Sequence, residues 1–305
     1  MTQDIRHKSL VTHEDVTALN FIRKSVTHVF RQYHKQGLRS HIMEVLNSDD
    51  VLKQNKGEVI DGTRFFPWAE PLKMLRIFRT KFDSLEEAFD EIRKLRIVET
   101  YLPEDSYAKS LEFIVDYIRN GTRDIILCGL QEYVDGEVLN PWALTDENLV
   151  ADLLSRMKVK GRHASEMTVE QRIKRFQKKV EAFIDGAKKM IVETRYVPDF
   201  AGVANLLVTA QGDIKLVDIN NISEVSFGPD IVLDDKGYPV SDKSIEAIWM
   251  LEKGLLDTPV DGTDPLYKLF LDPNRLKEVR YFEEKFHSAL TLNSSGEMQT
   301  KGDRP

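Results

Sequence analysis

The sequence lacks several features, and each absence excludes some kinds of protein. Its single cysteine, Cys128, lies in the apolar stretch DIILCGLQEYV, so no internal disulfide can form and the thiol is expected in the core. A lone thiol is typical of a reducing compartment. No stretch approaches the roughly eighteen consecutive apolar residues of a membrane span, and the N-terminal MTQDIRHKSLVTHED lacks the apolar middle of a secretory signal. We therefore expect a soluble, cytoplasmic protein with no membrane association.

An excess of basic residues is also missing. The chain carries 43 Lys and Arg against 50 Asp and Glu, a net charge of −7, which argues against a general nucleic-acid-binding protein. Hydrophobic residues make up 41% of its 305 positions, enough for a sizeable core. This length permits one large domain or two modest lobes.

The N-terminal third predicts helix, strand and helix in turn. A long helix is expected from Glu14 to Gln36, behind a Thr12 cap, and a strand around Met74 to Arg79. A capping box of Ser84 and Glu87 predicts a second helix. The spacing of three and four that predicts the first helix is carried by Leu19, Ile22, Val26, Val29, Phe30 and Tyr33.

Two strands, SLEFIVDYI and RDIILCGLQEYVDGE, are expected next, followed by long helices, a hairpin and further helices. The strongest helical pattern runs from Thr168 to Thr194, behind a Thr168/Gln171 capping box. We therefore predict an α+β protein of two lobes. Its expected parts are a helical extension (1–60), a small sheet-bearing N-lobe (61–138), a mostly helical C-lobe (139–291) and a disordered tail (292–305).

The stretch NLLVTAQGDIKLVD, from Asn205 to Asp218, carries the clearest chemical signal. It reads as two apolar strands joined by a turn at Gly212, with an Asn before the first strand and an Asp after the second. An amide oxygen and a carboxylate suit a hard cation such as Mg²⁺, which often shares its oxygen ligands with nucleotide phosphates. Taken alone, the same stretch is also compatible with a plain hairpin whose Asp218 caps a loop.

This block resembles the metal-binding block of the protein-kinase-like superfamily. The thirteen-residue separation of Asn205 and Asp218 matches, as do the apolar positions between them. The resemblance implies a two-lobed kinase-like fold that binds ATP and Mg²⁺, with Asn205 and Asp218 as metal ligands. It implies a phosphotransferase whose acceptor, a small molecule or a protein, is unknown.

Upstream residues extend the resemblance over about residues 70 to 255. Arg76, in LRIFR, stands where the family has a strand lysine that contacts phosphates, and Glu91 stands where the family has its helix partner. The segment LQEYVDGEVL resembles the hinge, whose backbone at Gln131, Glu132 and Tyr133 would meet adenine. Without the resemblance, Arg76 and Glu91 would be taken as solvated surface charges.

Asp199, in VPDFAGVAN, is the candidate catalytic base. It lies six residues before Asn205 where the family pattern has five, and Val197 and Pro198 replace the usual His-Arg. No glycine-rich phosphate loop precedes Arg76, since GEVIDG offers only a pair of glycines. Asp242 is a candidate brace for the catalytic loop, with a helix N-cap as its simpler role.

Two other functions stay open. A pseudokinase would bind nucleotide or a partner without transferring phosphate, as the departures around Asp199 and Arg76 suggest. An ATP-grasp ligase would use the DIN at 218–220, with Asp218 and Asn220 as metal ligands, and would need a carboxylate near position 205. Asn205 stands there instead.

Overall fold

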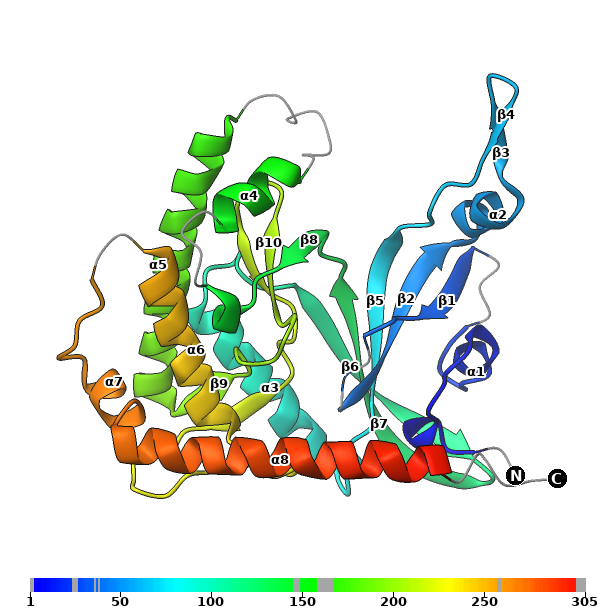
Figure 1. The fold of residues 1–305 in the computed structure, drawn as a ribbon. Coiled ribbons are helices and arrows are strands. Elements are labelled where there is room, and N and C mark those ends of the chain that lie inside the picture. Colours follow the sequence, from blue (N-terminus) through cyan, green and yellow to red (C-terminus); the bar gives the residue numbers. More distant parts are fainter. Residues whose placement is uncertain are drawn as a thin grey trace. The chain divides into compact units, whose positions relative to one another are not determined.

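The computed structural model describes residues 3–23, 27–35, 37, 39–144, 149–157, 167–256 and 259–299. The chain divides into two compact units (Figure 1). We call Met1–Arg93 with Ala108–Val134 the sheet unit, and Lys94–Tyr107 with Asp135–Pro305 the helical unit. The predicted α+β class is confirmed. In the part of the chain that is described, no helix is long and apolar enough to cross a membrane.

The sheet unit is built on one five-stranded sheet in which every neighbouring pair is antiparallel. Its order is β1-β2-β5-β7-β6. Both strands expected between residues 110 and 132 therefore lie in the same sheet as the strand predicted near Met74. The strands are β1 (His28–Gln32), β2 (Ser40–Asn47), β5 (Pro71–Phe78), β6 (Ser110–Arg119) and β7 (Thr122–Glu132).

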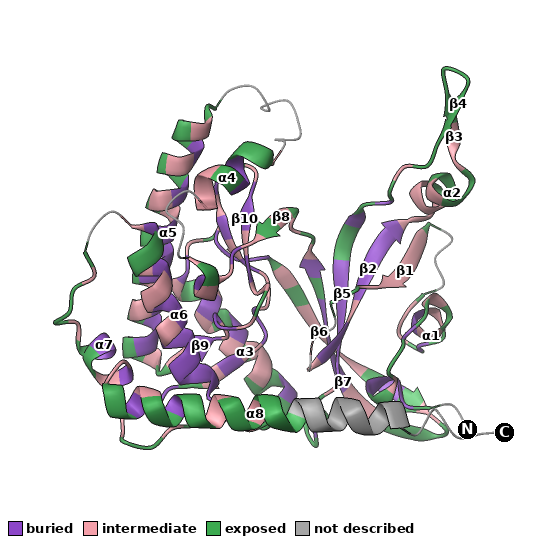
Figure 2. Cartoon of the chain, viewed as in Figure 1, coloured by how far each residue is buried: buried purple, intermediate pink, exposed green. Residues whose placement is uncertain are grey.

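Both faces of this sheet are covered, which explains the continuous apolar run of β7. One face packs against the N-terminal segment through Ile5, Val11 and Val16. The other face packs against helix α3 (Leu85–Tyr101), where Ala88 packs with Leu127 of β7 and Phe78 of β5. Figure 2 shows the resulting buried stripe along β2 and β5. Cys128 of β7 is fully buried on the face that packs against the N-terminal segment, and burial raises the pKa of its thiol to about 12.

The expectation of a long helix from Glu14 to Gln36, and hence of a helical extension over 1–60, is wrong. The Thr12 capping box forms, but the short 3-10 helix η1 (Ile5–His7) and helix α1 (His13–Thr17) are the only helices described before β1. Val29 and Phe30 pair with β2 instead. Residues four apart lie on one face of a helix and also on one face of a strand, so this spacing is compatible with both structures. The pairing with β2 decides in favour of the strand.

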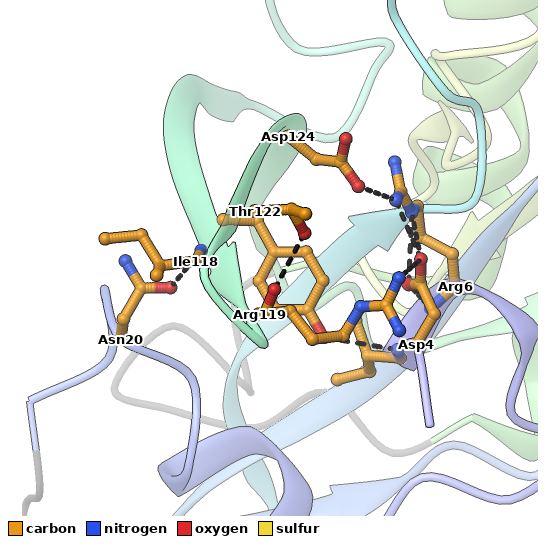
Figure 3. Close-up of polar contacts among 9 residues, drawn as sticks. Asp4, Arg6, Asn20, Ile118, Arg119, Thr122 and Asp124 are labelled. Carbon is orange, nitrogen blue, oxygen red and sulfur yellow. Dashed lines mark hydrogen bonds and ion pairs between the residues drawn. The ribbon is translucent and has the colours of Figure 1, made fainter. Parts of the chain in front are cut away.

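The N-terminal segment is tied to the β6–β7 hairpin by polar contacts (Figure 3). The buried guanidinium of Arg6 donates to Asp4 at 2.7 Å and to Asp124 of β7 at 2.6 Å. The carboxamide of Asn20 accepts the N–H of Ile118 at 3.0 Å. These long-range bonds make residues 3–23 part of the sheet unit rather than an extension.

The glycines of GEVIDG take part in local turns. Helix α2 (Ser48–Lys56) ends at Gly57, with φ 73°, and Gly62, with φ 77°, turns the hairpin of β3 (Glu58–Ile60) and β4 (Thr63–Phe65). Both φ values are ones that glycine adopts without strain.

The helical unit has one large apolar core. The longest helix with buried residues in this core is α5 (Val169–Thr194), which starts with the predicted capping box of Thr168 and Gln171. The unit also contains the C-terminal part of α3. Its other elements are η2 (Pro141–Ala143), α4 (Leu149–Arg156), α6 (Val240–Leu255), α7 (Pro265–Phe270) and α8 (Pro273–Gln299), with the sheets β8 (Gly136–Val138)-β10 (Leu206–Thr209)-β11 (Ile214–Leu216) and β9 (Tyr196–Pro198)-β12 (Ile222–Glu224).

The tail expected to be disordered from residue 292 is helical as far as Gln299, because α8 continues to that residue. Residues 300–305 lie outside the described residues.

Candidate functional site

The predicted hairpin forms and brings its two polar ends together. Leu206 pairs with Leu216 and Val208 with Ile214, and the turn uses Gly212 at φ 82°. Beyond these pairs, the N–H of Val217 donates to the carbonyl of Asn205 at 2.8 Å. Asn205 and Asp218 therefore lie at the same end of the hairpin, as the sequence indicated.

Asp199 begins a tight loop that returns to Asn205. Its Oδ1 accepts the N–H of Ala201 at 3.1 Å and of Gly202 at 2.9 Å, which closes a turn over its own side chain. The Nδ2 of Asn205 donates to the carbonyl of Asp199 at 2.8 Å. This bond uses the amide nitrogen of Asn205, so the amide oxygen Oδ1 remains as the atom that would bind a metal.

Asn221, which the sequence analysis did not single out, holds Asp199 from the other side. Its carbonyl accepts the N–H of Asp199 at 2.8 Å, and its Nδ2 donates to Asp199 Oδ2 at 3.1 Å. The pairing of Pro198 in β9 with Ile222 in β12 sets this register. The signal in the sequence was the INN that follows Asp218, where an amide stands three residues beyond the metal-type Asp.

The electrostatics of the loop link Asp199 to Asp218. Burial, and then the negative charge of Asp218, raise the pKa of Asp199 to about 6, against the opposing effect of the bonds from Gly202, Asn221 and Ala201. A nearby like charge makes a second ionised carboxylate costly, and a bound cation would relieve that cost. The described loop thus gathers Asp199, Asn205 and Asp218 into one group of oxygen donors.

The loop rests on α6 and η2. The N–H of Phe200 donates to Oγ of the buried Ser244 at 3.2 Å, and Nε1 of Trp142 donates to the carbonyl of Ala201 at 3.1 Å. Asp242, the expected brace, has a different partner: it forms a buried ion pair with Arg275, with Nη2 and Oδ2 3.2 Å apart. It does not cap α6 either, since the N-cap is Pro239.

The remaining predicted residues belong to the sheet unit. Arg76 is 4% exposed, so the surface-charge alternative is wrong for it. It lies opposite Gly129, which also lies opposite Glu112, and directly paired antiparallel residues share a face. Arg76 and Glu112 therefore share one row across the sheet, with Gly129 between them and the side chains of Ser110 and Glu112 close to it. Sequence reasoning missed Glu112, which becomes visible only through strand register.

Gln131 is buried in the next row of that face, opposite Met74 and Ser110. The N–H of Glu132 donates to the carbonyl of Lys109 at 2.8 Å, so this donor is engaged within the sheet unit, and Tyr133 follows it at the surface. Glu91 lies on α3, one residue before Ile92, which packs against the α3-covered face.

Asn220, a metal ligand in the ATP-grasp alternative, is buried at 6% exposure. Neither atom of its amide has a hydrogen-bond partner among the described residues, and both are shielded from solvent. The same restricted set contains no group of three His, Cys, Asp or Glu that could hold a metal. A cation at the hairpin would therefore rely on the carboxylate of Asp218, the amide oxygen of Asn205 and ligands from outside the chain.

No protein-family model matches this chain, and no curated protein matches it in sequence.

Proposed function

We propose that this protein binds ATP with Mg²⁺ through Asn205 and Asp218 and is a kinase-like phosphotransferase. The observation that carries the proposal is the grouping of these two side chains with Asp199, whose pKa the charge of Asp218 helps to raise. The donor set fits the ion, because Mg²⁺ binds through one or two carboxylates and completes its shell with water and phosphate oxygens. A cytoplasmic location, where a lone thiol stays reduced, belongs to this proposal.

The chain's own residues would then divide the work of phosphoryl transfer. The bound ion would neutralise phosphate charge. Asn205 and Asp218 would hold it, and Asp199 would take the proton of an acceptor hydroxyl. A carboxyl with a pKa of about 6 is close to the optimum for a base working near neutral pH.

Taken by itself, the sheet unit offers Arg76 as a phosphate-binding group, buried in the row it shares with Glu112. A guanidinium binds phosphate through a planar fork, unlike the point charge of a lysine.

One observation favours a second candidate, a pseudokinase. Asp199 accepts hydrogen bonds from Ala201, Gly202 and Asn221, so much of its acceptor capacity is used to hold the loop. In that role the protein would bind nucleotide without transferring phosphate. The ATP-grasp alternative has less support, because the amide of Asn220 is shielded from solvent and Asn205 replaces the required carboxylate.

Turnover of ATP tests the proposal. We expect Mg²⁺-dependent loss of the γ-phosphate in the wild type, abolished in Asp218→Asn. Asp213→Asn is the matched control, because Asp213 stands at the opposite end of the same strand and pairs with Arg175 at 2.8 Å. Nucleotide binding without turnover would favour the pseudokinase. Equal turnover in the wild type and Asp218→Asn would overturn the metal-site assignment.

A further inference from the structure

Two side chains outside the candidate loop hold the backbone that follows Asp199. Ser244 of α6 accepts the N–H of Phe200 at 3.2 Å, and Trp142 of η2 donates Nε1–H to the carbonyl of Ala201 at 3.1 Å. Ala201 is also one of the two residues whose N–H groups bond to the carboxylate of Asp199. The indole of Trp142 therefore bonds to the same short turn that orients this carboxylate.

Trp142 is itself fixed from two directions. Its backbone N–H donates to Oδ1 of Asn140 at 3.1 Å, which caps the short helix η2. The Nζ of Lys243 lies 4.0 Å from the centroid of its ring, within the range of a cation–π contact. The indole therefore has little freedom to turn away from Ala201.

Lys243 is an unusual neighbour because it is only 5% exposed. A buried ammonium is costly unless it is paired, and Lys243 meets Glu246 at 2.8 Å and Glu283 of α8 at 3.1 Å. Glu283 also accepts a hydrogen bond from the hydroxyl of Tyr238 at 3.3 Å. This network fixes the ammonium against the indole, and it joins α6 and α8 to η2.

We propose that Trp142, held in place by Lys243, is a positioning residue for Asp199. This role depends on the proposed function, in which Asp199 is the base. Small displacements of a reacting group lower the rate of a reaction without weakening substrate binding. The effect expected of this contact is therefore on turnover rather than on nucleotide affinity.

Trp142→Phe removes the indole N–H and keeps an aromatic ring for Lys243. Trp249→Phe is the matched control: Trp249 lies on α6 beneath Lys253, with Nζ 4.8 Å from its ring centroid. Both variants lose one indole N–H, but only Trp142 bonds to the loop. Lys243→Met removes the charge and Lys243→Arg keeps it.

Two measurements are made on each full-length variant. Amide hydrogen exchange at Ala201 and Gly202 reports the turn around Asp199 without any nucleotide. Steady-state turnover of Mg²⁺·ATP, with water as acceptor, separates kcat from KM. For Trp142→Phe we expect at least tenfold faster exchange and about tenfold lower kcat at unchanged KM, with neither change in Trp249→Phe.

Lys243→Met is expected to reproduce the effect of Trp142→Phe, with Lys243→Arg close to the wild type. The double variant of Trp142→Phe and Lys243→Met should add nothing further, because both act through one contact. Unchanged exchange at Ala201 and Gly202 in both Trp142→Phe and Lys243→Met would overturn the proposal. Faster exchange in Trp142→Phe and Lys243→Met, together with a wild type that does not turn over ATP, would keep the positioning role and refute the phosphotransferase.

Discussion

Gly202 and Asn205 are packed so closely that a Cβ on Gly202 would stand 2.3 Å from Nδ2 of Asn205 and 3.0 Å from Oδ2 of Asp199. No side chain fits this position unless the side chain of Asn205 moves. The sequence showed only FAG, in which the glycine looked like an ordinary turn residue. Its absence of a side chain is what lets Asn205 bond back to the carbonyl of Asp199.

Gly202→Ala should therefore displace Asn205 and weaken Mg²⁺·ATP binding at least tenfold. Overpacking of this kind costs about 1 to 3 kcal/mol of stability. Isothermal titration with Mg²⁺·ATP and denaturant unfolding measure the two effects. Gly262→Ala is the control, because a Cβ there meets nothing within 4 Å. Equal affinity in Gly202→Ala and the wild type would mean that Asn205 does not bind the ion.

The raised pKa of Asp199 predicts a pH dependence of stability. The folded protein holds this proton more tightly than the unfolded chain, so its stabilising effect is complete below about pH 4 and is lost as the pH rises through about 6. One pKa unit is worth about 1.4 kcal/mol, so the loss is on the order of 2 to 3 kcal/mol. Asp199→Asn should remove this component from unfolding curves recorded between pH 4 and 7. Parallel curves for the two proteins would contradict the assignment.

Asn221 should act on the same carboxyl. Its Nδ2 donates to Asp199 Oδ2 and favours the charged form, so Asn221→Ala is expected to raise the pKa of Asp199 above about 6. Carboxyl carbon NMR titration measures this shift. Asn220→Ala serves as the control, since the amide of Asn220 bonds to none of the described residues. An unchanged pKa in Asn221→Ala would show that this bond is not made in solution.

The buried pair of Asp242 and Arg275 should matter for stability alone. Arg275 also donates to the carbonyl of Gly228 at 2.8 Å, so Arg275→Met leaves Asp242 buried without its partner. We expect a loss of about 3 to 5 kcal/mol in the free energy of unfolding. Arg93→Met removes an exposed arginine paired with Glu86 and Asp90 and should cost about 1 kcal/mol or less. Similar losses in the two variants would contradict the importance of burial.

The sequence predicted local features well wherever one element carried its own signals. The helix of 168–194 has a capping box and a regular apolar stripe, and the hairpin of 205–218 has a turn glycine between two apolar runs. Both are confirmed. The α+β class could be predicted because most of the expected strands precede the long helices in the sequence.

Features that depend on distant partners were missed. Residues 28–32 became a strand because β2 pairs with them, which no local spacing reveals. Asn221 and Trp142 reach the candidate loop only through the pairing of β9 with β12 and the placement of η2. Glu112 joins the row of Arg76 through strand register alone.

Paramagnetic broadening by Mn²⁺·ATP tests the central claim most directly, because it locates the ion without requiring turnover. The claim predicts that backbone NMR signals of Asn205 and Asp218 broaden first, that excess Mg²⁺ restores them, and that Asp218→Asn removes the effect. Signals from Asp213, at the turn end of the hairpin, should respond much less. Broadening that leaves Asn205 and Asp218 untouched, or that persists in Asp218→Asn, would contradict a metal and nucleotide site at this hairpin.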